Sequence, residues 1–192
     1  MNRIYYLLLL TIIAASCRRS EIVEPIHHPG MKYTDLKNAE MKVGKSQRAD
    51  IDGDGVDDFA FGTLLVGDPV FQRDRLQFYA YSFIKKNLLV DGEEQTPVKS
   101  RNEKISSFQD GYNWFEIAAI VLAEKITPLQ GMVNWQGAWK HADHKFLPVQ
   151  LDKNGQLYNG WIEVSFDMAD EKLILHRSGI SMEADQTVLA SY

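Results

Sequence analysis

Residues 48–62 read RADIDGDGVDDFAFG, an acidic turn that runs directly into an apolar segment. If Asp50 is position 1, aspartates follow at positions 3, 5 and 9, and a glycine stands at position 6. This is the spacing by which a tight loop turns alternate carboxylates towards one Ca²⁺, and the glycine permits the sharp turn. The predicted calcium ligands are the carboxylates of Asp50, Asp52, Asp54 and Asp58 and the backbone carbonyl of Val56.

The loop differs from an EF-hand at its end. Position 12, where an EF-hand supplies a bidentate glutamate, is Phe61, and residues 59–66 have the apolar pattern of a strand rather than of an exiting helix. A solvated acidic turn that binds no metal is the simpler alternative. The match of five fixed positions in one register favours calcium over that alternative.

The acidic turn resembles the loop of FG-GAP type repeats, in which an Asp-x-Asp-Gly-Asp-Gly-x-x-Asp run leads directly into a strand. Those repeats build propellers from several copies. This chain has one copy, because the nearest second run, residues 152–155, lacks the later acidic residues. The resemblance therefore implies a calcium loop and does not imply a propeller.

Residues 1–16 have the pattern of an export signal, with Arg3 before an apolar run and small residues at 14–16. The apolar run is shorter than the ~20 residues of a membrane-spanning helix. The small residues before Cys17, the only cysteine, resemble the lipobox of bacterial lipoproteins. This resemblance implies that Cys17 is lipidated and anchors an exported protein to a membrane of the cell envelope, on its periplasmic or surface face. An ordinary secreted protein with a free thiol is the alternative.

The rest of the chain is predicted to form a tether and one domain. Residues 17–30 are polar and interrupted by Pro25 and Pro29, which is typical of a flexible tether. Residues 31–192 are enough for a single domain with its own core. That domain has no cysteine, so no disulfide stabilises it. The formal net charge of −5 argues against nucleic acid as a partner.

The pattern of the domain indicates an all-β fold. Residues 59–66 and 76–83 read as strands with a side-chain period of two, and the second carries aromatic residues on both faces. Asp91-Gly92 and Asn154-Gly155 favour two-residue hairpin turns, because both central residues need a positive φ. The second turn predicts a three-stranded meander of residues 146–151, 157–166 and 173–180. We therefore expect an antiparallel β-sandwich of jelly-roll-like topology with at most one short helix.

Residues 113–126 are the one candidate for that helix. Apolar residues recur there at helical spacing, Asn113 can cap the start and Pro128 can stop the helix. The run of residues 117–122 can equally be a buried strand. The spacing favours the helix slightly.

Residues 155–165 resemble the "YGW" hairpin near the C-terminus of many secreted bacterial β-proteins of unknown function. Those proteins also carry a single Asp-rich loop after an opening strand, much as residues 32–35 precede the loop here. Where that family has Tyr-Gly-Trp, this chain has Tyr158, Asn159, Gly160 and Trp161. The resemblance implies an exported all-β fold with a metal loop, and it implies no activity.

Aromatic residues near this hairpin are candidates for ligand binding. Trp161 and Glu163 share one face of the predicted strand, where a ring can stack on a sugar and a carboxylate can accept hydrogen bonds from its hydroxyl groups. A solvated sheet face, or packing beneath a long loop, is the alternative. The candidate ligand-binding residues are Tyr158, Trp161, Glu163, Trp135 and Trp139.

No sequence motif indicates catalysis. A Gly-x-Ser-x-Gly motif is absent, the cysteine is expected to carry lipid, and His141 and His144 lack a third zinc ligand. The main hypothesis is a non-catalytic, calcium-binding module of the cell envelope that binds a glycan or a protein. The alternatives are a purely structural envelope lipoprotein and a glycan hydrolase that pairs Glu163 with Glu116 or Asp110.

Overall fold

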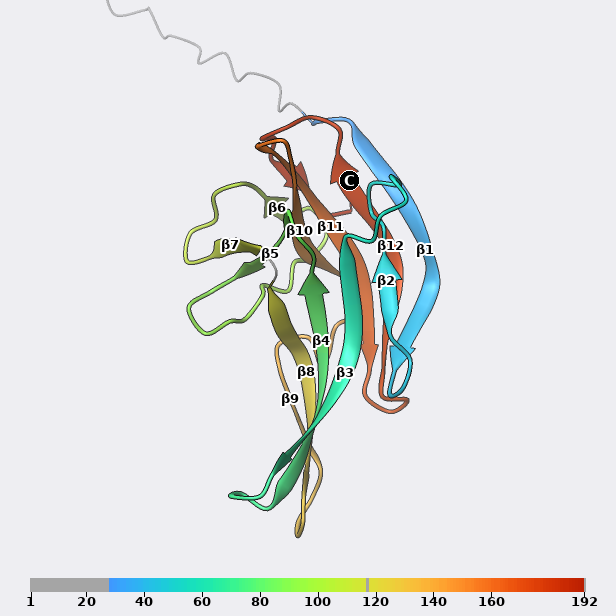
Figure 1. Cartoon of the computed structure of the whole chain (residues 1–192), viewed down its shortest axis with the longest axis vertical. Helices are drawn as coiled ribbons and strands as arrows, with labels where there is room; N and C mark the ends of the chain where they lie inside the picture. Colours follow the sequence, from blue (N-terminus) through green and yellow to red (C-terminus); the bar gives the residue numbers. More distant parts are fainter. Residues whose placement is uncertain (1–27, 117, 192) are drawn as a thin grey trace, which may run out of the picture.

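The computed structural model describes residues 28–116 and 118–191, and this part of the chain forms thirteen strands and no helix. Eleven strands form two antiparallel sheets that pack face to face (Figure 1). The first sheet has the order β1 (Met31–Lys42), β12 (Lys172–Ser181), β11 (Gln156–Asp167), β10 (Lys145–Lys153), β5 (Lys86–Val90) and β7 (Asn113–Glu116). The second has the order β2 (Gln47–Ala49), β3 (Phe59–Asp68), β4 (Arg73–Ser82), β8 (Ala119–Pro128) and β9 (Asn134–Gln136). The predicted antiparallel sandwich is therefore confirmed.

The main core lies between the two sheets, because alternate residues of each strand point inwards. In β3, Phe59 and Phe61 are buried, and in β11 Ile162 is buried. Phe78 of the second sheet packs edge to face against Phe166 of the first, with ring centroids 5.0 Å apart. These apolar and aromatic contacts hold the two sheets together.

Strands β10, β11 and β12 form the predicted meander. The turn between β10 and β11 has positive φ at Asn154 (57°) and Gly155 (82°), as a two-residue hairpin of type I′ requires. The hairpin predicted at Asp91-Gly92 is wrong. β5, which ends just before it, pairs with β10 and β7 and not with the segment that follows the turn.

The helix predicted over residues 113–126 is also wrong, since this segment contributes β7 and most of β8. β8 lies between β4 and β9, and its inward side chains include the buried Ile120. A bulge at Leu122 makes two residues of β8 face one residue of β4, so that Leu122 and Ala123 are both buried. This break in the alternation explains why the apolar spacing imitates that of a helix.

A second, smaller core lies on the outer face of the first sheet. Trp161 packs there edge to face against Phe146, with ring centroids 5.2 Å apart. Ile105 of β6 (Lys104–Ile105) and Val188 of β13 (Val188–Leu189) cover this pair, and the two short strands pair with each other. Both faces of the meander are therefore buried around Trp161.

The described part of the chain begins close to the domain. The predicted signal and Cys17 lie outside the described residues. Gly30, at the end of the predicted tether, is bonded to the segment after β12, because its N–H donates to Glu183 Oε1 (3.1 Å) and its carbonyl accepts from Met182 N–H (2.8 Å). Across residues 28–116 and 118–191, no helix has the length and apolar character needed to cross a membrane.

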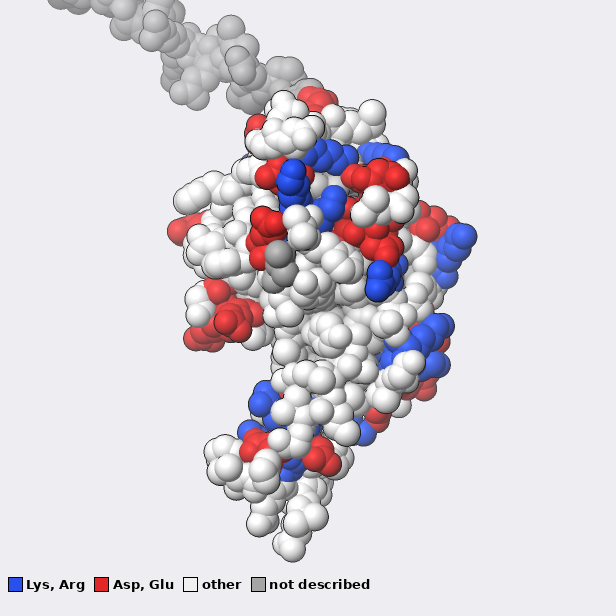
Figure 2. Space-filling view, in the orientation of Figure 1, with Lys and Arg blue, Asp and Glu red and all other residues white. Residues whose placement is uncertain are grey.

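The second sheet continues beyond the first as a narrow arm made of the distal parts of β3, β4, β8 and β9 (Figure 1). The arm ends in two loops whose apolar side chains are exposed, and Figure 2 shows this tip as uncharged. In Figure 1 the tip lies at the opposite end of the molecule from residue 28. The exposed apolar residues of the two loops are Val70, Phe71, Leu129, Met132 and Val133.

Candidate metal centre

The acidic loop joins β2 to β3 at one end of the second sheet. The N–H of Asp58 donates to the carbonyl of Ala49 (2.8 Å), which closes the loop where the two strands pair. Ile51 is fully buried and anchors the loop in the main core. The strand predicted directly after the loop is confirmed as β3. The loop is thus fixed at both ends by the sandwich.

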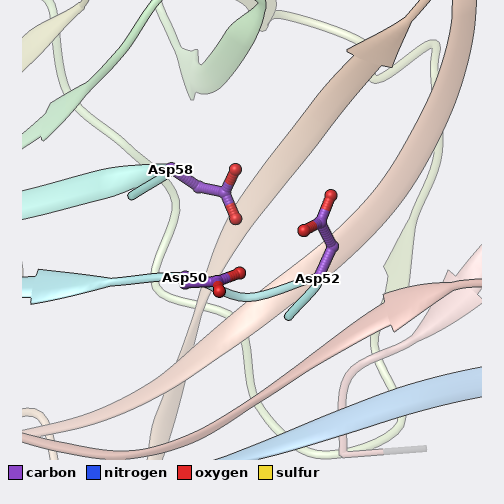
Figure 3. A group of neighbouring side chains, drawn as sticks. All are labelled: Asp50, Asp52 and Asp58. Carbon is purple, nitrogen blue, oxygen red and sulfur yellow. The ribbon is translucent and has the colours of Figure 1, made fainter. Parts of the chain in front are cut away.

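Three of the four predicted carboxylates converge. One oxygen each of Asp50, Asp52 and Asp58 lies within 4.8 Å of the others. Figure 3 shows the three side chains pointing towards a common space. Asp58 is fully buried and Asp52 is 5% exposed, whereas Asp50 is half-buried. Three carboxylates held this closely repel one another unless a cation lies between or beside them.

Backbone N–H groups of the same loop orient these carboxylates. Asp50 accepts from Gly53 N–H (2.6 Å) and from Gly55 N–H (2.8 Å), and both glycines have positive φ. Asp58 Oδ2 accepts from the N–H of Ile51 (2.8 Å). Asp52 Oδ1 accepts from the N–H of Asp54 (3.1 Å). The Asp-Gly-Asp-Gly pattern therefore builds a turn whose N–H groups hold the carboxylates in place.

One oxygen of each buried carboxylate has no hydrogen bond: these are Asp52 Oδ2 and Asp58 Oδ1. Each nevertheless has an ammonium group near it. Lys86 Nζ lies 2.7 Å from Asp58 Oδ1, and Lys153 Nζ lies 2.8 Å from Asp52 Oδ2. These two contacts are ion pairs. Lys32 Nζ donates to the backbone carbonyl of Asp52.

The two buried carboxylates differ in their acidity. Burial raises the pKa of Asp58, and the ammonium group of Lys86 only partly opposes this effect. Burial also acts to raise the pKa of Asp52, but Lys153 and a backbone N–H stabilise its charged form more strongly, so that its pKa is lowered. A divalent cation would favour the charged form of both groups.

Asp54 does not join the cluster of three carboxylates. Asp54 is exposed, and its Oδ1 accepts a hydrogen bond from Val56 N–H (2.8 Å). The side chain of Val56 is exposed to solvent, and coordination by its backbone carbonyl stays a prediction. The structure therefore brings together Asp50, Asp52 and Asp58 of the predicted ligand set and leaves Asp54 outside.

No protein-family model, curated protein or solved structure matches this chain. On its own geometry, the group of Asp50, Asp52 and Asp58 can hold a metal ion.

The predicted aromatic binding surface is not formed. Trp161 is 0% exposed and Trp139 is 1% exposed, so neither ring offers a face to a ligand. Trp135 is half-buried and packs edge to face against Phe166 at 5.3 Å. Tyr158 is half-buried under the ammonium group of Lys153, which lies 5.4 Å from the ring centroid. The sequence pattern did not reveal that β6 and β13 cover the outer face beside β11.

Glu163 is buried in a polar cluster and is not paired with a second carboxylate. Its two oxygens contact Arg177 Nε (2.6 Å) and His144 Nδ1 (2.7 Å). Burial acts to raise the pKa of Glu163, but these two partners outweigh it, and the pKa is lowered. Glu116 on β7 lies three strands away from β11, roughly 14 Å at the usual strand spacing. That distance exceeds the separation that a glycoside hydrolase requires.

Proposed function

We propose that this chain is an exported, lipid-anchored β-domain of the cell envelope that binds Ca²⁺ in the loop of residues 50–58. One observation carries the calcium proposal: one oxygen each of Asp50, Asp52 and Asp58 lies within 4.8 Å of the others, and the buried oxygens Asp52 Oδ2 and Asp58 Oδ1 have only a lysine ammonium group beside them. Ca²⁺ prefers six to eight oxygen ligands, which carboxylates, backbone carbonyls and water supply. The hard carboxylate set suits Ca²⁺ better than it suits zinc or copper.

In this proposal, Lys86 and Lys153 neutralise the loop when calcium is absent. Their ammonium groups contact one oxygen each of the two buried carboxylates. A calcium ion therefore competes with these ammonium groups for the carboxylates, and this competition lowers the affinity relative to a loop without lysines. We expect a moderate affinity, of the kind suited to a compartment that is rich in calcium.

The test is thermal unfolding of the purified protein in Ca²⁺ and in chelator. A site occupied at a hundredfold excess over its Kd adds about 2.7 kcal/mol to the free energy of unfolding, which raises Tm by several degrees. Asp52→Asn should remove this shift while preserving the shape of the side chain. Asp57→Asn is the matched control, because the Asp57 carboxylate is paired with Arg48 (3.0 Å) and is not part of the cluster. Equal Tm values for the wild type in both buffers would contradict the calcium proposal.

The anchor is tested separately from the metal. The proposal rests on the small residues before Cys17. Cells that express Cys17→Ser should release the protein from the membrane fraction and should no longer incorporate a labelled fatty acid into it. Unchanged membrane attachment of this variant would contradict lipidation and leave the calcium test unaffected.

A further inference from the structure

A polar cluster forms on the outer face of the first sheet, where the register of β12 breaks. Glu163 of β11 is paired with Arg177 of β12, but the next residue, Val164, is paired with Leu175. His176 is therefore an extra residue in this ladder. On the other side of β12, Asp35 of β1 faces Arg177 and Ala39 faces Leu175, so that residues 36–38 bulge out of β1. Such bulges re-aim side chains and are frequent beside active sites.

The two bulges gather side chains that regular strands would separate. Because the extra residue interrupts the alternation, His176 and Arg177 both contact outward-facing residues of β11, which are Ser165 and Glu163 respectively. In the β1 bulge, Asn38 adopts the left-handed conformation (φ 51°) and reaches His176. No sequence pattern predicts this arrangement, because it depends on register breaks between three strands.

The result is a hydrogen-bonded relay of three side chains. Ser165 Oγ lies 2.8 Å from His176 Nε2. His176 Nδ1 lies 2.6 Å from Asn38 Oδ1. The amide oxygen can only accept, so it fixes the proton on Nδ1 and leaves Nε2 free to accept the hydroxyl proton of Ser165. A nucleophile, a base and a group that orients the base define the geometry of activated serine nucleophiles, whatever their order in the chain.

Two further contacts support the nucleophile. The backbone N–H of His144 donates to Ser165 Oγ (2.9 Å), which stabilises negative charge on this oxygen. The ring of His144 stacks on that of His176 with centroids 4.2 Å apart. Burial, followed by the nearby His144, lowers the pKa of His176, and Glu163 and Asp143 oppose this effect. A lowered pKa keeps His176 neutral and able to act as a base near pH 7.

The relay borders an open pocket of about 460 Å³. Asn38 and His176 line it, whereas Ser165 is half-buried beside it. Arg177, which is paired with Glu163 through Nε, also lines the pocket and brings a guanidinium group to its wall. The remaining lining residues are Tyr33, Thr34, Asp35, His144 and Glu163. The open pocket has room for a small substrate.

We propose that Ser165 is a catalytic nucleophile that hydrolyses small carboxylic esters, with His176 as its general base and Asn38 as a positioning residue. Ser165 Oγ attacks the carbonyl carbon while His176 Nε2 takes the hydroxyl proton. The bond from that carbon to the alcohol oxygen breaks, and His176 passes the proton to the departing alcohol. Water then attacks the acyl-serine, His176 takes its proton and returns it to Ser165 Oγ, and the carboxylic acid leaves.

The first experiment treats the purified wild-type protein with a fluorophosphonate probe, which phosphonylates activated serines with loss of fluoride. Mass spectrometry of the digested protein should find the adduct on Ser165. Ser100→Ala is the matched control, because the hydroxyl of Ser100 contacts Lys145 Nζ (3.1 Å) and no histidine. This control should label like the wild type, and Ser165→Ala should not label. A folded wild-type protein that gains no adduct on Ser165 overturns the proposal without recourse to any variant.

The second experiment measures hydrolysis of p-nitrophenyl acetate. Loss of the nucleophile or the base should lower kcat at least about 100-fold in Ser165→Ala and His176→Gln. The wild-type rate should rise with pH as His176 loses its proton. Asn38→Leu should lower kcat with little change in KM and shift this pH profile, which a merely structural role would not do. Equal rates for the wild type and a folded Ser165→Ala overturn the proposal. The assay is run in chelator and in Ca²⁺, so that its result is separate from that of the calcium test.

Discussion

At the scale of single residues, the polar cluster on β12 predicts how stability depends on pH. Burial and His144 lower the pKa of His176 in the folded protein. The unfolded chain therefore binds a proton near pH 6.5 at a position where the folded protein does not, and stability falls as the pH drops below that value. Urea unfolding at pH 7.5 and pH 5.5 should show this loss, and His176→Gln should reduce it. Loss of the same size in wild type and variant would show that another group is responsible.

The carboxylates act in a separate and lower pH range. The lowered pKa values of Glu163 and Asp52 mean that each contributes stability above its ordinary pKa, and this contribution is lost as the pH falls through the folded value. The contribution of Asp58 to stability has the opposite sign. Because its pKa is raised in the folded protein, the folded protein binds a proton there at a higher pH than the unfolded chain does. The loss between pH 7.5 and pH 5.5 is therefore attributable to histidine rather than to these carboxylates.

At the scale of elements, Gly179 of β12 leaves room for the ring of Trp161, its partner on the neighbouring strand β11. A Cβ atom at Gly179 would lie 2.7 Å from Cζ2 and 2.8 Å from Cε2 of that ring. Gly179→Ala should therefore push the buried ring away and lower the free energy of unfolding by roughly 1–3 kcal/mol, as overpacking does. Gly92→Ala is the control, because a Cβ there meets nothing within 4 Å. Denaturant unfolding of both variants checks this, and equal stability would contradict the packing described here.

The elements also show which features a sequence can predict. The spacing of the aspartates predicts the acidic loop, and Asn154-Gly155 predicts the hairpin turn between β10 and β11. Both features depend only on neighbouring residues and on their φ angles. The prediction fails for residues 113–126, where a bulge in β8 changes the period. It also misses the Ser165 cluster, since register breaks between strands distant in the chain decide which side chains meet. Burial of Trp161 depends in the same way on β6 and β13.

At the scale of the whole molecule, the acidic loop links the two sheets. The loop belongs to the second sheet, whereas Lys86 and Lys153, which contact it, stand on β5 and β10 of the first. Lys86→Met should leave the buried charge of Asp58 unpaired and cost roughly 3–5 kcal/mol in chelator. With calcium the cost should shrink, because the ion replaces the ammonium group. The Tm shift on adding Ca²⁺ should therefore be larger than in the wild type.

Lys153→Met is the comparison for this prediction. The side chain of Lys153 is 43% exposed, against 12% for Lys86, so its loss in chelator should cost much less. Thermal unfolding of both variants with and without Ca²⁺ provides the measurement. If Lys86→Met is as stable as the wild type in chelator, the ion pair contributes nothing to the link between the sheets.

The bulge of residues 36–38 has a consequence for aggregation. β1 is a long strand at the edge of the first sheet, and such an edge offers unpaired N–H and C=O groups to strands of other molecules. The bulge interrupts the backbone of this edge near its middle and places Lys37 there, exposed and with positive φ. Beyond the bulge, Glu40 and Lys42 already bond Gln47 Nε2 and the backbone of Lys45, so an incoming strand would find mainly the segment before the bulge to pair with. The distortion that aims Asn38 at His176 thus also keeps separate molecules from joining edge to edge.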